Sequence, residues 1–156
     1  METWADKIKG SLAKKSKAKG VRGCMIWRGY SRNNYGYFNT KVPGSNKRTM
    51  IHVHRVAYMA YTENVHLPKG CDVSHLCHRS LCVCFEHLSV EPRRINNSRK
   101  TCRKNRTCAG HGGYPDCLVW TTMSCKFLSS ILLNCTFTNR PLSWCSHLDF
   151  LPFKSM

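Results

Sequence analysis

The sequence predicts an α+β fold: a small antiparallel sheet, then a ββα unit, then an irregular C-terminal tail. Over residues 24–54, aromatic and β-branched residues surround turn signals, as in paired strands. Over 71–117, Cys and His residues gather in short loops, which is typical of a small domain stabilised by bound metal ions. From Leu118 onward the chain is rich in Leu, Ser, Phe and Cys and has no clear periodicity.

Length and charge limit the function classes. The 156 residues suit one domain with a tail, and the formal net charge is +17. Of this charge, +15 lies in residues 1–117. Such an imbalance indicates a polyanionic partner, which we expect to be double-stranded DNA. The apolar run of the tail is interrupted by Lys126 and polar residues, so we expect no membrane span.

The eleven cysteines admit two explanations. One is a disulfide scaffold in a secreted protein. The other is zinc binding in a reducing compartment, where clustered Cys and His serve as ligands. The N-terminal sequence METWADKIKG lacks an apolar signal segment, which favours an intracellular protein. The Lys-rich run after it points to a nuclear location.

We divide the chain into three parts on composition. Residues 1–22 form a basic flexible arm, because 7–22 are rich in Lys and show no apolar stripe. The arm is expected to settle on phosphates when DNA is present. Residues 23–117 form the zinc-bound domain. Residues 118–156 form an apolar tail that either packs on a partner subunit or is poorly ordered.

The first half of the domain predicts an antiparallel sheet and a helix. Strands are expected near 24–30, 35–41 and 48–54, separated by turn signals. A helix is expected near 55–63, where Val56, Met59 and Ala60 keep a helical spacing.

Basic side chains decorate these strands. These side chains could simply form a solvated sheet face without a binding role. Alternatively, the strands could form a β-ribbon that lies in the major groove of DNA, which is the interpretation we favour. His52 and His54 alternate on the last strand and are expected to share a sheet or DNA-facing side. The residues predicted to contact DNA are Arg28, Arg32, Lys41, Lys47 and Arg48.

Two groups of Cys and His residues have metal-ligand spacing. Cys102, Cys108, His111 and Cys117 supply four ligands within sixteen residues, with glycines and a proline that permit tight turns. In the other group, three residues resemble ligands: Cys77, Cys82 and His87. Its fourth ligand is left open between Cys71, Cys84 and a distant residue such as Cys24.

The sequence of the second half of the domain predicts the ββα unit. Residues 71–76 and 87–91 are expected to be strands, and Pro92 to open a helix at its first position. His75 lies on the first strand and Asn96 on the helix, so we expect them to face each other across a gap that fits a phosphate.

These residues resemble the His-Cys box homing endonucleases, a branch of the ββα-metal (His-Me finger, HNH-like) nucleases. The resemblance runs from Ser74-His75-Leu76-Cys77-His78 through the two Cys/His groups to Cys117. Upstream pieces such as Gly23–Tyr30 and His54–Tyr58 also look like related HNH-type nucleases. The resemblance covers about 21–117 and does not cover the tail.

The resemblance implies roles for individual residues. The first zinc ion would take Cys24 beside Cys77, Cys82 and His87, leaving Cys71 and Cys84 spare. His75 would be the catalytic base and Asn96 the ligand of a catalytic metal ion. The implied reaction leaves 5′-phosphate and 3′-hydroxyl ends, and the implied assembly is a homodimer, because one ββα site cuts one strand.

The chemistry of the residues agrees with these roles. A neutral imidazole suits deprotonation of water near neutral pH, and Mg²⁺ prefers oxygen ligands such as the Asn96 carbonyl. Arg55 is a candidate for holding the scissile phosphate, against an ordinary helix-start Arg paired with a local acid. We expect two structural zinc ions, one catalytic Mg²⁺, and a DNA endonuclease. The alternative is a catalytically inactive zinc-dependent DNA-binding protein.

Overall fold

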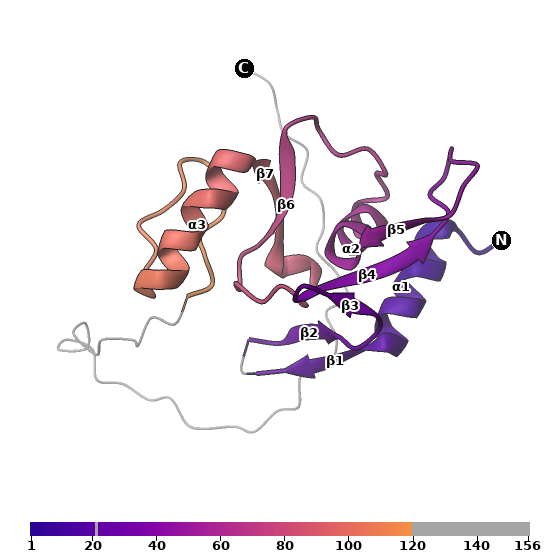
Figure 1. Ribbon diagram of the computed structural model, residues 1–156, viewed down its shortest axis with the longest axis horizontal. Coiled ribbons are helices and arrows are strands. Elements are labelled where there is room, and N and C mark those ends of the chain that lie inside the picture. The colour runs from indigo at the N-terminus through magenta and orange to yellow at the C-terminus, as the bar shows by residue number, and fades with distance from the viewer. Residues whose placement is uncertain (21, 120–156) are drawn as a thin grey trace, which may run out of the picture. The chain divides into compact units, whose positions relative to one another are not determined.

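Small antiparallel sheets and three helices make up the computed structural model, which describes residues 1–20 and 22–119 (Figure 1). This confirms the predicted α+β class. The predicted tail falls almost wholly outside the described residues. In chain order the elements are α1 (Trp4–Lys15), β1 (Ser16–Lys19), β2 (Cys24–Trp27), β3 (Ser31–Arg32), β4 (Tyr35–Thr40), β5 (Thr49–His52), α2 (Val53–Thr62), β6 (Cys71–His75), the 3₁₀ turn η1 (Phe85–His87), β7 (Leu88–Pro92) and α3 (Arg93–Asn105).

The N-terminal region is folded, which corrects the prediction of a flexible arm over 1–22. Helix α1 begins with a capping box in which Thr3 and Asp6 satisfy each other's backbone N–H groups. Its residues Ala5, Ile8 and Leu12 are buried in the core, at a spacing that places them on one helical face. The lysines between them face outward, which is why composition alone suggested a solvated arm.

The strands form separate small sheets rather than the single sheet expected from 24–54. Strand β2 pairs with β1, and β4 lies between β3 and β5. Strand β5 ends at His52, so the chain turns into α2 two residues earlier than expected. His54 is therefore not on a strand face with His52. It lies in the first turn of α2 and is 6% exposed.

The core lies around α2, which packs against α1 and against β4, β5 and β6. Val53, Val56 and Ala60 on α2 are fully shielded, and Trp27 from β2 contacts Phe38 of β4 at a ring-centroid distance of 5.7 Å. Apolar burial of this kind contributes about 25 cal/mol per Å².

The predicted ββα unit is present. Strands β6 and β7 pair antiparallel, with His75 opposite Leu88, and α3 lies against this hairpin (Figure 1). Pro92 is the residue before the first turn of α3 rather than its first helical residue. Within the described ranges, no helix has the length and apolar character of a membrane span.

The close approach of β4 to the core gives a stability prediction. A Cβ added at Gly36 would lie 2.5 Å from Trp27 and 2.6 Å from Val53, so Gly36→Ala should lower the free energy of unfolding by about 1–3 kcal/mol. Gly10 in α1 has nothing within 4 Å, so Gly10→Ala should raise it by about 0.5–1 kcal/mol. Urea unfolding of both variants measures the difference, and equal effects would contradict the packing of β4 on Trp27.

Candidate metal centres and catalytic site

The first Cys/His cluster joins two distant parts of the chain. Cys24 begins β2, whereas Cys77, Cys82 and His87 come from the loop between β6 and β7 and its 3₁₀ turn. One ligand atom from each of the four lies within 4.8 Å of the others. The thiols of Cys24 and Cys82 are each 3.5 Å from His87 Nδ1. Of the alternatives left open by spacing, the structure brings Cys24 into this cluster.

The second cluster closes the end of α3. Cys102 lies on α3, and Cys108, His111 and Cys117 lie on the loop after it. His111 Nε2 is 3.5 Å from Cys102 Sγ and 3.2 Å from Cys117 Sγ. Ser98 Oγ donates to the Ile95 carbonyl at 2.7 Å and lies 3.0 Å from His111 Nδ1. Because the Ser98 hydroxyl proton is donated to Ile95, the Ser98 oxygen accepts a hydrogen bond from His111 Nδ1–H. His111 Nε2 therefore keeps its lone pair for a metal ion.

Both clusters fit zinc by donor type and spacing. Three thiols and one imidazole form a usual structural zinc set, and a tetrahedron with normal Zn–S and Zn–N bonds has an S···N edge of about 3.5 Å. The S···N distances of 3.2–3.5 Å in the two clusters match that edge. The eight cysteines in the described part of the chain are all free, which argues against a disulfide scaffold. Cys71 and Cys84 belong to neither cluster.

His75 ends β6, two residues before the cluster residue Cys77. Its Nε2 lies 3.2 Å from the carbonyl oxygen of Cys82, another cluster residue. A carbonyl can only accept, so Nε2 carries the proton and Nδ1 keeps a free lone pair in the neutral ring. Burial lowers the pKa of His75 to about 4, although the Cys82 carbonyl opposes this shift. The imidazole is therefore neutral at pH 7.

Three imidazoles and a phenol meet beside β6. The ring of His54 is 4.5 Å from that of His75 and 5.4 Å from that of His52, and Tyr35 lies 6.4 Å from His75. Burial, then the neighbouring His75, His52 and Arg55, lowers the pKa of His54 to about 2. The Nδ1 atoms of His52 and His54 are buried without a hydrogen-bond partner among the described residues.

Sequence reasoning missed His54 as a neighbour of His75. A signal was available, because His54 precedes Ala57 by three residues and so shares its buried helical face. The error came from extending β5 to residue 54.

Asn96 lies in the first turns of α3, where its Nδ2 donates to Asp72 Oδ2 at 3.4 Å. This contact occupies the donor side of the amide, so Oδ1 is left to accept or to ligate. Asp72 is a second residue that the sequence interpretation passed over, and it also pairs with Arg93 at 3.4 Å. An amide oxygen beside a carboxylate fits a hard cation such as Mg²⁺ by donor chemistry.

His75 and Asn96 belong to different sides of the hairpin. Side chains alternate along β6, so Asp72 and Ser74 point toward α3, whereas Val73 and His75 point toward α2. The direct facing of His75 and Asn96 that we expected from the sequence is therefore not found, because the two side chains lie on opposite faces of β6. Among the described strands β6 pairs only with β7, so its other edge carries no paired strand.

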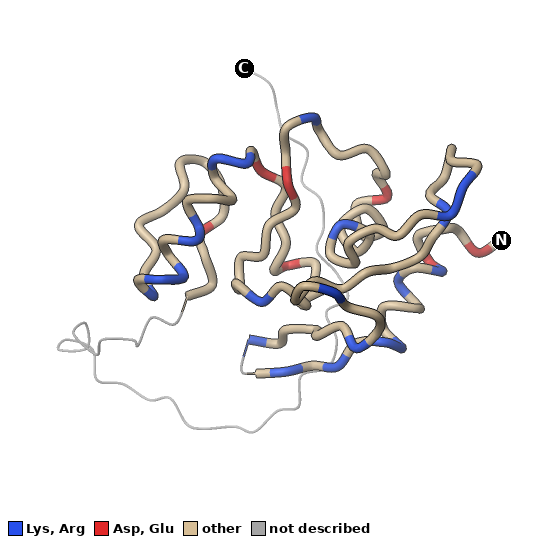
Figure 2. Tube along the Cα trace, viewed as in Figure 1, with Lys and Arg blue, Asp and Glu red and all other residues tan. Residues whose placement is uncertain are grey.

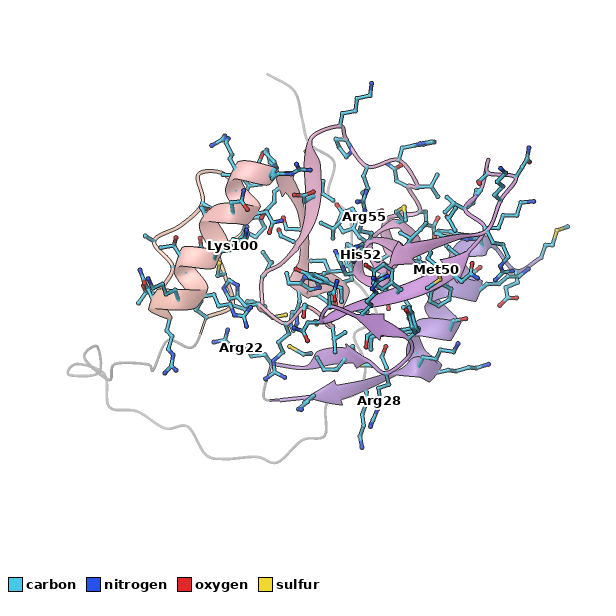
Figure 3. All side chains as sticks on the ribbon, viewed as in Figure 1. Arg22, Arg28, Met50, His52, Arg55 and Lys100 are labelled. Atoms are coloured by element: carbon cyan, nitrogen blue, oxygen red, sulfur yellow. The ribbon has the colours of Figure 1, made fainter. Side chains whose placement is uncertain are left out.

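Arg55 lies in the first turn of α2, beside His52 (Figure 3). Together with His52, Met50 and neighbouring apolar residues, it lines a hollow of about 480 Å³. The ion pairs found among the described residues join Lys9 to Glu63, Arg93 to Asp72 and Arg99 to Glu91. The alternative of an Arg55 paired with a local acid is therefore not found in the described part of the chain.

The outer face of the β3–β4–β5 sheet is aromatic with a basic rim. Tyr35, Tyr37 and Asn39 alternate outward from β4, beside Met50 and His52 of β5. Figure 2 shows basic residues on the loop between β4 and β5 and along β1 and α3. The five residues predicted to contact DNA are all exposed, namely Arg28, Arg32, Lys41, Lys47 and Arg48.

Comparison with known families agrees with this arrangement. Residues 18–127 match the family described as the zinc-binding loop region of homing endonuclease. The chain belongs to this family. The match contains both Cys/His clusters and confirms the His-Me, HNH-like resemblance drawn from the sequence.

Two phage proteins share part of the sequence. A 92-residue stretch is 37% identical to "Protein 2.8" of Escherichia phage T7 and covers 59% of this chain and 56% of that protein. An 87-residue stretch is 28% identical to the "Uncharacterized gene 5.3 protein" of Enterobacteria phage T3 and covers 53% of this chain and 86% of that protein. The chain thus spans little more than half the length of the T7 protein. No solved structure matches the chain significantly.

The clusters predict a defined metal content. The protein should contain two equivalents of zinc, and Cys82→Ser should lose one of them, because a Cys3His set reduced to two thiols binds zinc more weakly. Elemental analysis of dialysed protein measures this. Cys84→Ser is the matched control and should keep both ions, since Cys84 lies outside the cluster. Loss of zinc from the control but not from Cys82→Ser would show that the ligand set is wrong.

Proposed function

We propose that the protein is a metal-dependent DNA endonuclease that uses His75 as its general base. The observation that carries the proposal is the contact between His75 Nε2 and the Cys82 carbonyl at 3.2 Å, which fixes the tautomer of a neutral imidazole next to a metal cluster. Membership of the homing-endonuclease zinc-loop family supports the same reaction class.

The proposed reaction is hydrolysis of one phosphodiester bond at the open edge of β6. His75 Nδ1 removes a proton from a water molecule, and the resulting hydroxide attacks phosphorus. The bond from phosphorus to the 3′ oxygen breaks, and solvent protonates that oxygen. The products are a 5′-phosphate and a 3′-hydroxyl.

Asn96 is the proposed holder of a catalytic Mg²⁺, with the nearby Asp72 carboxylate adding attraction for a cation. When bound, Mg²⁺ supplies charge stabilisation to the pentavalent phosphorus centre and the leaving 3′ oxygen. The role of Asp72 in the chain itself is to orient the Asn96 amide, because it accepts from Nδ2 and leaves Oδ1 free.

Arg55 is proposed to hold the scissile phosphate. Its guanidinium lies close to His52 and lowers the pKa of that imidazole, although burial lowers it more. No described acidic residue forms an ion pair with Arg55, so its donors remain available for phosphate oxygens.

The aromatic and basic face of the β3–β4–β5 sheet is proposed to lie against DNA. Exposed Tyr35 and Met50 offer apolar contacts to bases or sugars, and the basic rim offers contacts to phosphates. The ring contacts from Tyr35 through His54 to His75 connect this face to the catalytic base. A duplex placed on this face would contact Tyr35, whose ring lies 6.4 Å from that of His75.

Cleavage of supercoiled plasmid in Mg²⁺ tests the catalytic residues. His75→Ala should bind DNA as the wild type does but cut it at least ~10²-fold more slowly, which is the usual contribution of a general base. Asn96→Ala should also cut slowly, and higher Mg²⁺ should partly restore its rate.

The adjacent Asn97→Ala is the matched control and should cut normally, because Asn97 is exposed. Wild-type rates in His75→Ala would refute the catalytic assignment. Binding without any cutting by the wild type would instead identify an inactive zinc-dependent DNA-binding protein. Accumulation of nicked circles would indicate that one site acts at a time, whereas direct linearisation would support a homodimer.

The salt dependence of binding tests the sheet face. Each Lys that neutralises a phosphate contributes about −0.9 to the slope of log Kobs against log salt concentration. The double variant Lys41→Ala, Lys47→Ala should therefore flatten the slope by about 2. Lys9→Ala is the control, since Lys9 lies on α1 and pairs with Glu63. Anisotropy titrations at several salt concentrations measure both, and an equal change in the control would refute the sheet face as the DNA surface.

A further inference from the structure

A buried ion pair lies between the β6–β7 hairpin and the second Cys/His cluster. Glu91 on β7 is 0% exposed and Arg99 on α3 is 2% exposed. Arg99 Nε donates to Glu91 Oε1 at 2.7 Å, and Nη2 donates to Oε2 at 2.6 Å. The pair is bidentate, and both side chains are shielded from water.

The same guanidinium reaches the loop of the second cluster. Arg99 Nη2 donates to the Pro115 carbonyl at 2.8 Å, and Nη1 donates to Cys117 Sγ at 3.3 Å. Cys117 is one of the four residues of that cluster. One side chain therefore joins the carboxylate on the hairpin to a proposed zinc thiolate.

The carboxylate extends the connection to the strand that carries His75. The Ser74 hydroxyl donates to Glu91 Oε1 and lies 3.3 Å from the Ser89 carbonyl. Ser74 immediately precedes His75. A chain of side-chain contacts thus runs from Cys117 through Arg99 and Glu91 to Ser74.

A second connection reaches the other side of His75 through the backbone. The residue after Cys117 is Leu118, whose N–H donates to the Leu76 carbonyl at 2.8 Å. Leu76 immediately follows His75 and donates its own N–H to the His87 carbonyl at 2.8 Å. The segment around Cys117 therefore holds the strand at the residues on either side of His75.

We propose that Arg99 and Glu91 are positioning residues that couple the second Cys/His cluster to β6, the strand that carries His75. The second cluster would then fix His75 in place, in addition to closing the end of α3. The inference rests on the proposed endonuclease function for its catalytic consequence, but the mechanical coupling is measurable without cleavage. Lys cannot replace Arg99 here, because a single ammonium cannot span the carboxylate, a carbonyl and a thiolate in the geometry of a planar fork.

The test is Arg99→Lys compared with Arg93→Lys. Arg93 is a matched control, since it is an Arg on the same helix that pairs with the same hairpin through Asp72 but is 75% exposed. Both variants should bind two zinc ions and bind DNA normally. Arg99→Lys alone should show at least ~10-fold faster amide exchange at Leu76 and Leu118, because the buried contacts that hold these strands are lost. Its single-turnover cleavage rate should fall at least ~10-fold with unchanged DNA affinity.

Unchanged exchange at Leu76 in a folded Arg99→Lys protein would overturn the coupling. If Arg99→Lys does not fold, Ser74→Ala decides, because it removes the hydroxyl through which Glu91 contacts the strand of His75 and keeps the four residues of the second cluster. Faster exchange at Leu76 and slower cleavage in Ser74→Ala support the proposal, and wild-type values overturn it. If the wild type does not cut DNA, the endonuclease proposal fails while the exchange data still decide the coupling.

Discussion

The four residues of the first cluster set the constraint on which the remaining structure depends. Cys24 comes from the strand β2, and the other three come from the loop that closes the β6–β7 hairpin, so one bound ion would tie together segments more than fifty residues apart. A protein this small buries a limited apolar core, and such a tie replaces contacts that a larger domain would make. The His75 backbone and the Cys82 carbonyl that orients its ring both lie in the same short stretch.

Much of the candidate site could be predicted from the sequence because metal ligands carry their signal in spacing. Cys102, Cys108, His111 and Cys117 are local, and their convergence follows from short glycine-containing loops. Cys24 is distant from its partners, so spacing left it open beside Cys71 and Cys84, and only the family resemblance favoured it. The start of the helix of the ββα unit was also predictable, since Pro92 marks it within one residue.

Other features depend on tertiary contacts that no local pattern contains. The side chains of α1 looked solvated because lysines dominate its composition, although Ala5, Ile8 and Leu12 share one face. The same error hid the strand β1, so its pairing with β2 was not predicted. The Asp72 contact with Asn96 and the burial of Glu91 with Arg99 join residues on separate elements, and charged residues in a basic helix ordinarily indicate a solvated surface.

Helix α1 has a consequence for how this protein is divided into fragments. Composition suggests starting a minimal domain at Gly23, but such a fragment would lack Ile8 and Leu12, which cover the side of the core formed by α2. It would also lack the partner of β2 and so leave an unpaired edge next to Cys24. Shortened versions of the chain therefore keep this side of the core covered, and β2 paired, only when they include α1 and β1.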